Sequence, residues 1–246
     1  MSKARTALKK CFWPSLLVLL CLLTLGILLD TGILWPNDVF VAHYRVRGID
    51  VSSYQHRIDW QSVAQTGEYA FAYIKATEGT TYQDAYFQAN WRGAQAYGLL
   101  RGAYHYFTVG QSGAEQANHY ISIVPKEAGM LPPMLDLEVS GKDRTVMLRQ
   151  ITIFLDRLRQ YYGVTPLIYT DPQRYAEYIQ GHFEDYPLTI SDVMTPPQWI
   201  GVTTWTFWQY SDHGHVSGIA GLVDLDAFYG LRDQLNTLLT QQAAHL

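Results

Sequence analysis

The sequence predicts an α/β protein, a parallel barrel of about eight strands that follows a membrane-spanning helix. Strand-like and helix-like stretches alternate five times between residues 47 and 179. Three more strand-like stretches follow without clear helices between them. An uncharged apolar run at residues 12–29 precedes the whole domain.

The strand-like stretches are rich in β-branched and aromatic residues and are bounded by turn residues. Parallel strands that are joined by helices form a covered sheet, and about eight of them close into a barrel. We therefore predict a TIM-like (β/α)5(β)3 barrel. Its expected strands are 47–51, 69–75, 99–107, 134–139, 166–170, 188–190, 206–210 and 223–228.

The helix-like stretches carry apolar residues at three- and four-residue spacings. The clearest of them ends at Gly163, and another begins with Ser112 as its expected cap and Glu115 three residues later. The first five helices are expected to connect successive strands. The expected helices are 58–66, 84–97, 112–123, 146–162, 172–179 and 231–239.

The apolar run at 12–29 is long enough to span a membrane, for which about 17–25 apolar residues suffice. Basic residues in segment 1–11 predict that this end stays in the cytoplasm and that the rest of the chain lies outside. A cleaved signal peptide is the alternative, but the bulky residues 27–29 offer no small-x-small cleavage site. Lipidation of Cys21 is a weaker alternative, because Leu20 before it is bulky.

Residues 30–46 have no clear hydrophobic period and are expected to form a tether, so the exported domain is 47–246. Cys11 and Cys21 lie in or beside the apolar run, so the exported part is expected to fold without disulfides and without a thiolate metal site. We therefore expect a single-pass protein of the cytoplasmic membrane with its domain on the periplasmic or extracellular side.

Net charge and the absence of certain motifs limit the classes of molecule that the exported part is expected to bind. After residue 29 the chain has 14 basic and 22 acidic residues, a net charge of about −8, which disfavours binding to nucleic acid. An uncharged polymer such as a glycan is compatible with this charge. The chain contains neither a GxxxxGK loop nor a GxGxxG turn, and we expect no cofactor.

Two acids stand one residue apart in the expected strand 134–139. Asp136 and Glu138 are at positions i and i+2, which point to the same face of a strand. Close carboxyls in a partly dry site cannot ionise independently, and such a pair suits the acid and stabiliser roles of a hydrolase. The alternative is a solvated or ion-paired couple. Asp50 and Asp224 also lie among strand-like residues, so we expect a cluster of acids where the strands end.

Eight motifs in order resemble the glycoside hydrolase family 25 lysozymes, muramidases of the Chalaropsis type. The resemblance covers about residues 47–230 and implies a flattened eight-stranded barrel with five helices. It also implies hydrolysis of the β-1,4 bond between N-acetylmuramic acid and N-acetylglucosamine in peptidoglycan, with retention. The motifs are GIDVS (48–52), IDW (58–60), IKATEG (74–79), GAYHYF (102–107), LDLE (135–138), IYT (168–170), FWQYS (207–211) and VDL (223–225).

The resemblance also implies roles for individual residues. Glu138 matches the general acid, and Asp136 matches the residue that orients the N-acetyl group of the substrate when that group is the nucleophile. Asp50 and Asp224 match the other acids of the site. Aromatic positions of the cleft match Tyr104 and Tyr169.

Four further features have two possible roles each. Glu78 is expected at the mouth of the site, with a solvated loop acid as the alternative, and Trp208 is expected to touch glycan, with a core position as the alternative. His105 is expected to be a hydrogen-bonded wall residue rather than a metal ligand, and 213–215 a turn. No metal site is predicted.

The segment 188–197 departs from the family pattern, because it lacks the aromatic residue that usually ends this strand. Asp192 is expected to cap the loop that follows, with a new polar contact as the alternative. A missing stacking platform makes a glycan-binding relative without turnover the alternative function. Because all four acids are retained, we favour catalysis.

Overall fold

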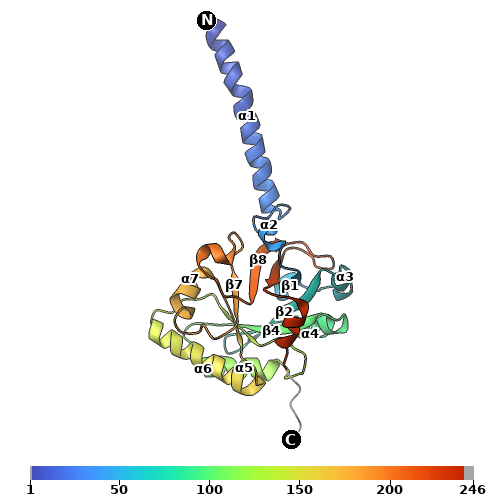
Figure 1. Ribbon diagram of the computed structural model, residues 1–246, viewed down its shortest axis with the longest axis vertical. Coiled ribbons are helices and arrows are strands. Elements are labelled where there is room, and N and C mark those ends of the chain that lie inside the picture. Colours follow the sequence, from blue (N-terminus) through green and yellow to red (C-terminus); the bar gives the residue numbers. More distant parts are fainter. Residues whose placement is uncertain (1, 241–246) are drawn as a thin grey trace.

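The computed structural model describes residues 2–240, with side chains from residue 13 onward (Figure 1). A long helix, α1 (Ser2–Asp30), extends away from an α/β barrel. The expected segment 1–11 and the end of the expected domain, 241–246, therefore lie partly or wholly outside the described residues.

The strands form a closed barrel, which confirms the predicted fold class. Its order is β1-β9-β8-β7-β6-β5-β4-β2, and β2 pairs again with β1. Neighbours are parallel except around β9, which is antiparallel to both β8 and β1. A short strand that the sequence did not predict, β3, pairs with β2 outside the ring. The strands are β1 (Val46–Val51), β2 (Tyr69–Glu78), β3 (Tyr82–Gln83), β4 (Leu100–Tyr106), β5 (Met134–Leu137), β6 (Leu167–Thr170), β7 (Leu188–Ser191), β8 (Phe207–Gly214) and β9 (Val223–Phe228).

Side-chain caps explain where most of the connecting helices begin. Asp59, Ser112, Asp143 and Asp171 each accept hydrogen bonds from backbone N–H groups of the next turn, which satisfies donors that a helix start leaves free. The expected helix 172–179 is one α-helical turn followed by a π-helical turn, η2 (Tyr175–Ile179). The helices are α2 (Asp38–Val41), α3 (Trp60–Gln65), α4 (Phe87–Ala96), α5 (Gly113–Ile123), α6 (Arg144–Tyr162), α7 (Pro172–Arg174) and α8 (Arg232–Thr237), with short 3-10 turns η1 (Ser53–Gln55) and η3 (Pro197–Ile200).

The core has two layers because strand side chains alternate between the barrel interior and the outer helices. Inside the barrel, large rings are accommodated by glycines on neighbouring strands. A Cβ at Gly48 would lie 2.2 Å from the Phe71 ring, and a Cβ at Gly102 would lie 2.2 Å from the Tyr73 ring. Any larger residue at either glycine would therefore push a ring out of the barrel interior.

The outer face of β8 has no crossover helix and is covered by segment 30–46, the expected tether. Asn37 is fully buried there, and its amide donates to the backbone oxygens of Asp192 and Tyr210, at 3.0 Å each. Tyr44 packs edge-on against Trp205 and Trp208. This segment is therefore packed against the barrel along much of its length. β8 also continues to Gly214, so the expected turn at 213–215 is wrong at its first two residues.

Candidate active site

The barrel brings the four predicted acids to one rim. Asp50 lies near the end of β1, Asp136 lies in β5, and Glu138 follows β5 directly. Asp224 is at the start of β9, but because β9 runs antiparallel its start lies at the same rim, where Asp224 pairs with Asp50. Together they line a cleft of about 340 Å³.

Burial and mutual repulsion raise the pKa values of these acids. The pKa of Asp50 is well above its usual value because the carboxyl is buried and because Asp224, Asp226 and Asp136 lie nearby. Burial and the charge of Glu138 raise the pKa of Asp136 in the same way. One carboxyl oxygen of Asp136, Oδ1, is buried with no hydrogen-bond partner among the described residues. These carboxyls therefore cannot all be ionised at once.

Asp224 and Glu138, at the edge of the cluster, are less deeply buried than Asp50 and Asp136, and their pKa values are also raised. Burial and the neighbouring Asp212 raise the pKa of Asp224 to about 7. The pKa of Glu138 is also raised, first by burial and then by Asp171, while Tyr169 and Arg174 oppose the rise. Near neutral pH this arrangement allows a protonated carboxyl beside an ionised one.

Two tyrosines form walls of the cleft, as the resemblance implied. Tyr104 interacts with Asp50 through a hydrogen bond that favours the ionised carboxyl. The hydroxyl of Tyr169 donates to Gln209 Oε1 at 2.7 Å and lies 3.4 Å from Glu138 Oε1. Ser191 donates to the same oxygen of Gln209 at 2.5 Å. Tyr169 is thereby fixed beside the edge of the cleft.

The structure adds a cation that sequence reasoning missed. Lys75 lines the cleft, where its charge lowers the pKa values of Asp136 and Glu138. Its ammonium is 2.7 Å from Glu78 Oε2 and 5.0 Å from the centre of the Tyr106 ring. The motif 74–79 was part of the resemblance, but nothing in the sequence shows that Lys75 points to the acids.

Comparison with known proteins decides the family. The model for Glycosyl hydrolases family 25 matches residues 49–219. The chain belongs to this family. Lysozyme M1 of Streptomyces globisporus is 36% identical over 214 residues, which cover 80% of this chain and 72% of that protein. The protein YegX of Escherichia coli (strain K12) is 38% identical over 203 residues, 80% of this chain and 75% of its own length.

A solved structure supports the same family assignment. The family 25 glycosyl hydrolase from Bacillus anthracis superposes with a TM-score of 0.75 at 33% identity and covers 79% of this chain and 94% of that one. The resemblance seen in the sequence motifs is thus confirmed, and the chain is a glycosidase of this family.

Two of the expected site residues, Trp208 and Glu78, do not line the cleft. Trp208 is 0% exposed and faces outward from β8, and its Nε1–H donates to the backbone oxygen of Asp192 at 2.9 Å. The expected glycan contact of Trp208 is therefore wrong, and the neighbouring Gln209 faces the cleft instead. Glu78 is partly exposed and outside the lining of the cleft; it pairs with Lys75, and its charge contributes to the raised pKa of Asp136.

The segment in which the chain departs from the family pattern ends at the cleft without an aromatic group. β7 ends at Ser191, whose hydroxyl binds Gln209. Asp192 Oδ1 accepts hydrogen bonds from the backbone N–H groups of Met194 and Thr195, at 3.0 and 2.8 Å. The predicted loop cap at Asp192 is confirmed.

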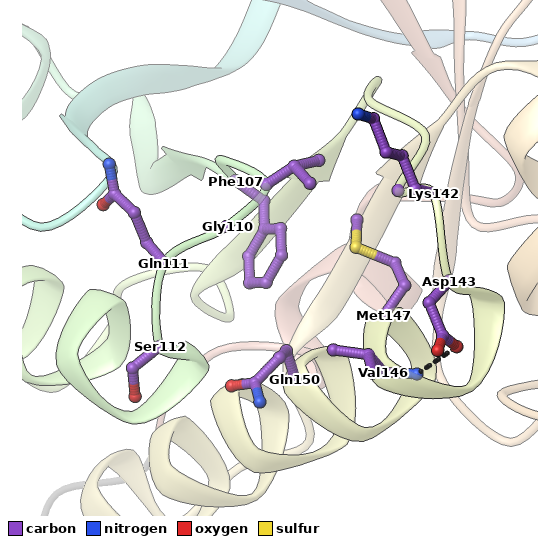
Figure 2. Close-up of a pocket in the computed structure, with 11 residues that line it drawn as sticks. Phe107, Gly110, Gln111, Ser112, Lys142, Asp143, Val146, Met147 and Gln150 are labelled. Carbon is purple, nitrogen blue, oxygen red and sulfur yellow. Dashed lines mark hydrogen bonds between the residues drawn. The ribbon is translucent and has the colours of Figure 1, made fainter.

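A second cavity, of about 290 Å³, lies between the loop after β4 and the start of α6. Figure 2 shows the Phe107 ring and the Met147 side chain on opposite sides of it, with Lys142 near its edge. Its one carboxyl, Asp143, accepts a hydrogen bond from Val146 N and caps α6. Glycoside hydrolysis generally needs two carboxyls, so this cavity is not the candidate site.

Proposed function

We propose that the chain is a lysozyme, an N-acetylmuramidase that cleaves the β-1,4 bond between N-acetylmuramic acid and N-acetylglucosamine in peptidoglycan with retention. Family membership and similarity to Lysozyme M1 support the substrate. The observation that carries the proposal is the single cleft lined by Asp50, Asp136, Glu138 and Asp224.

Glu138 is the proposed general acid. Protonation of the leaving glycosidic oxygen requires a carboxyl that keeps its proton near neutral pH. Burial raises the pKa of Glu138, and its position after the end of β5 leaves it at the more open part of the cleft. The Tyr169 hydroxyl, 3.4 Å away, helps to orient it.

Asp136 is the proposed partner of the N-acetyl group of the substrate, which would act as the nucleophile. A side-chain nucleophile would have to face the acid across the bond, with the carboxyls about 5 to 5.5 Å apart. Asp136 and Glu138 come from the same strand end, which suits assistance by the substrate better. Asp136 lines the cleft, where its carboxylate would accept a hydrogen bond from the amide N–H of the substrate.

Asp50 and Asp224 would complete the electrostatics of the site. They are paired across β1 and β9, and an ionised carboxyl of this pair would stabilise the positive charge that develops on the sugar in an oxocarbenium-like transition state. Tyr104 and Tyr169 would form the walls of the cleft. The charge of Lys75 would favour the ionised form of Asp136 by lowering its pKa.

Membrane attachment is part of the proposal. One stretch of α1, Trp13–Asp30, is long and apolar enough to cross a membrane, and a signal sequence has the same properties. Basic residues ahead of it favour a cytoplasmic segment 1–11, an anchor 12–29, a tether 30–46 and an exported catalytic domain 47–246. The proposed location is the cytoplasmic membrane, with peptidoglycan strands as the partner outside it.

Digestion of purified peptidoglycan tests the activity. The purified chain should release fragments with new reducing muramic acid ends, detected by mass spectrometry, and Glu138→Gln should not. Glu115→Gln, a change at an exposed acid of α5 outside the cleft, is the matched control and should keep wild-type release. Binding to peptidoglycan without any release by the wild type would instead identify a glycan-binding protein without turnover.

A further inference from the structure

Exposed apolar side chains gather around the base of α1. Ile33, Val39, Met194 and Trp199 are 65%, 74%, 58% and 67% exposed, and Leu34 lies beside Ile33 at 47%. These five residues are named the apolar collar. Single exposed apolar residues are ordinary on protein surfaces, but a group of them next to an apolar helix is not.

The collar is one surface although its members are distant in the sequence. The ring of Phe40, next to Val39, packs edge-on against Trp199 at 4.8 Å between centroids. Asn37 donates to the backbone oxygen of Asp192, whose carboxylate in turn accepts from Met194 N. The segment after α1 and the segment after β7 are thus joined by direct contacts.

Three further contacts place the end of α1 at the catalytic rim. Trp35 Nε1 donates to the backbone oxygen of Tyr210 at 2.8 Å, and its ring stacks on His213 at 4.6 Å. His215 Nε2 lies 2.8 Å from the backbone oxygen of Thr31, directly after α1. Asp212, the neighbour of His213, lines the cleft. In Figure 1, α1 leaves the barrel above α2 and close to β8.

The chemistry of the collar fits lipid. Its residues are apolar, and it is continuous with a helix that is apolar enough to span a bilayer, while the exposed acids Asp30 and Asp38 lie beside it in the sequence. Tryptophan is enriched at the boundary between lipid headgroups and acyl chains. The acidic exported domain and the exposed carboxylates of Asp30 and Asp38 favour uncharged headgroups over anionic ones.

We propose that the apolar collar rests in the headgroup and acyl boundary of the bilayer that α1 crosses, and so holds the catalytic cleft beside the membrane surface. The inference rests on the proposed membrane anchor. It extends the proposed function by limiting cleavage to glycan strands close to the membrane, since the packed segment 30–46 gives the barrel little freedom to move outward.

Spin labels on the full chain in phosphatidylcholine and phosphatidylethanolamine vesicles test the proposal. In a chain with Cys11 and Cys21 changed to serine, single labels are placed at Val39→Cys, Met194→Cys, Leu22→Cys and Tyr97→Cys. Leu22 lies in α1, and Tyr97 is an exposed aromatic residue between α4 and β4, at the rim opposite the cleft. Collisions with dissolved oxygen, which partitions into lipid, are compared with collisions with a water-soluble nickel complex.

The expected result is an oxygen-to-nickel ratio several-fold higher at residues 39 and 194 than at residue 97. Two collar positions are used so that misfolding of one variant leaves the other informative. Lipid exposure at residue 22 with water exposure at both collar positions would overturn the collar and leave the anchor standing. Water exposure at residue 22 would overturn both. Dipolar broadening between labels at residue 194 would mean that a second copy covers the collar, which also overturns the proposal.

Peptidoglycan digestion by the same vesicles separates this inference from the proposed function. Loss of the collar signal with full release of reducing ends would remove the membrane contact only. Lipid exposure of the collar without release of reducing ends would remove the muramidase proposal and keep the contact.

Discussion

Neighbouring residues of β4 belong to two buried polar sites that differ in whether their polar groups have hydrogen-bond partners. Tyr104 points into the barrel toward the acids, and His105 points outward between α5 and α6. The ring nitrogens of His105 lie 2.7 Å from Thr77 Oγ1 and 3.2 Å from Gln116 Oε1, so both have partners. Burial lowers the pKa of His105 to about 3, and the imidazole stays neutral.

The acids of the inner site are crowded together, and one of their oxygens lacks a hydrogen-bond partner within the described part of the chain. Its carboxyls raise one another's pKa values, and Asp136 Oδ1 has no hydrogen-bond partner among the described residues. A buried polar group that stabilises a fold is normally satisfied, whereas an unsatisfied one costs stability and needs a reason. The satisfied outer histidine therefore serves the structure, whereas the inner acids have raised pKa values and line a cleft, which is typical of a ligand site.

The largest expected effect is on turnover at the inner site. Asp136→Asn should lower kcat on peptidoglycan by about 10²- to 10³-fold, the loss typical of one preorganised electrostatic group. The Tm should stay equal or rise, because the change removes a carboxyl that is crowded by other acids. Steady-state kinetics and thermal unfolding measure both, with Asp156→Asn at an exposed acid of α6 as the control. A variant that no longer folds would make Asp136 a structural residue.

The outer site should show the reverse. His105→Ala leaves a cavity and removes the ring partner of Thr77 Oγ1 and one of several partners of Gln116 Oε1, which should cost about 2 to 3 kcal/mol of unfolding free energy. Activity per folded molecule should remain, since His105 does not line the cleft. Urea unfolding and an assay at low temperature test the two statements. Loss of activity without loss of stability would place His105 in the catalytic machinery.

Both sites should change stability with pH, in opposite directions. The pKa of Asp224 is raised to about 7 from 3.8, so the stability that it contributes below pH 4 is lost as the pH rises toward 7. The pKa of His105 is lowered to about 3 from 6.5, so its contribution is present above pH 6.5 and is lost as the pH falls.

The two pH effects can be separated by substitution. The stability of Asp224→Asn relative to wild type should increase from pH 4 to pH 7 by more than about 1.4 kcal/mol, the equivalent of one pKa unit. The relative stability of His105→Gln should instead increase as the pH falls from 6.5. Urea unfolding across this range measures both. Curves parallel to the wild type would show that neither group titrates differently on folding.

The sequence was sufficient for the barrel and for the acids, for different reasons. Alternating strand-like and helix-like stretches define a parallel barrel, and the i and i+2 spacing puts Asp136 and Glu138 on one face. Asp224 was expected at the end of a strand and lies at the start of an antiparallel one, which reaches the same rim. The packing of segment 30–46 was not predictable, because its contacts with β8 depend on single residues such as Asn37.

The phase of β8 was also beyond the sequence, because barrel strands are buried on both faces and carry large apolar residues on each. Trp208 and Gln209 are adjacent and point to opposite sides. Only the pairing of Gln209 with Asp226 and Ser191 fixes which one faces the acids. An aromatic residue in a glycan-binding family was the more obvious candidate, and it was the wrong one.

The smallest expected effect tests this assignment of the two faces. Trp208→Phe keeps an aromatic ring and loses the hydrogen bond to Asp192, so it should cost about 1 kcal/mol of unfolding free energy and leave KM unchanged. Gln209→Met, a change of similar volume one residue away, should lower kcat, because Tyr169 loses the acceptor that fixes it beside Glu138. A raised KM in Trp208→Phe with unchanged stability would mean that the indole reaches substrate. That outcome would reverse the assignment of the inner and outer faces of β8.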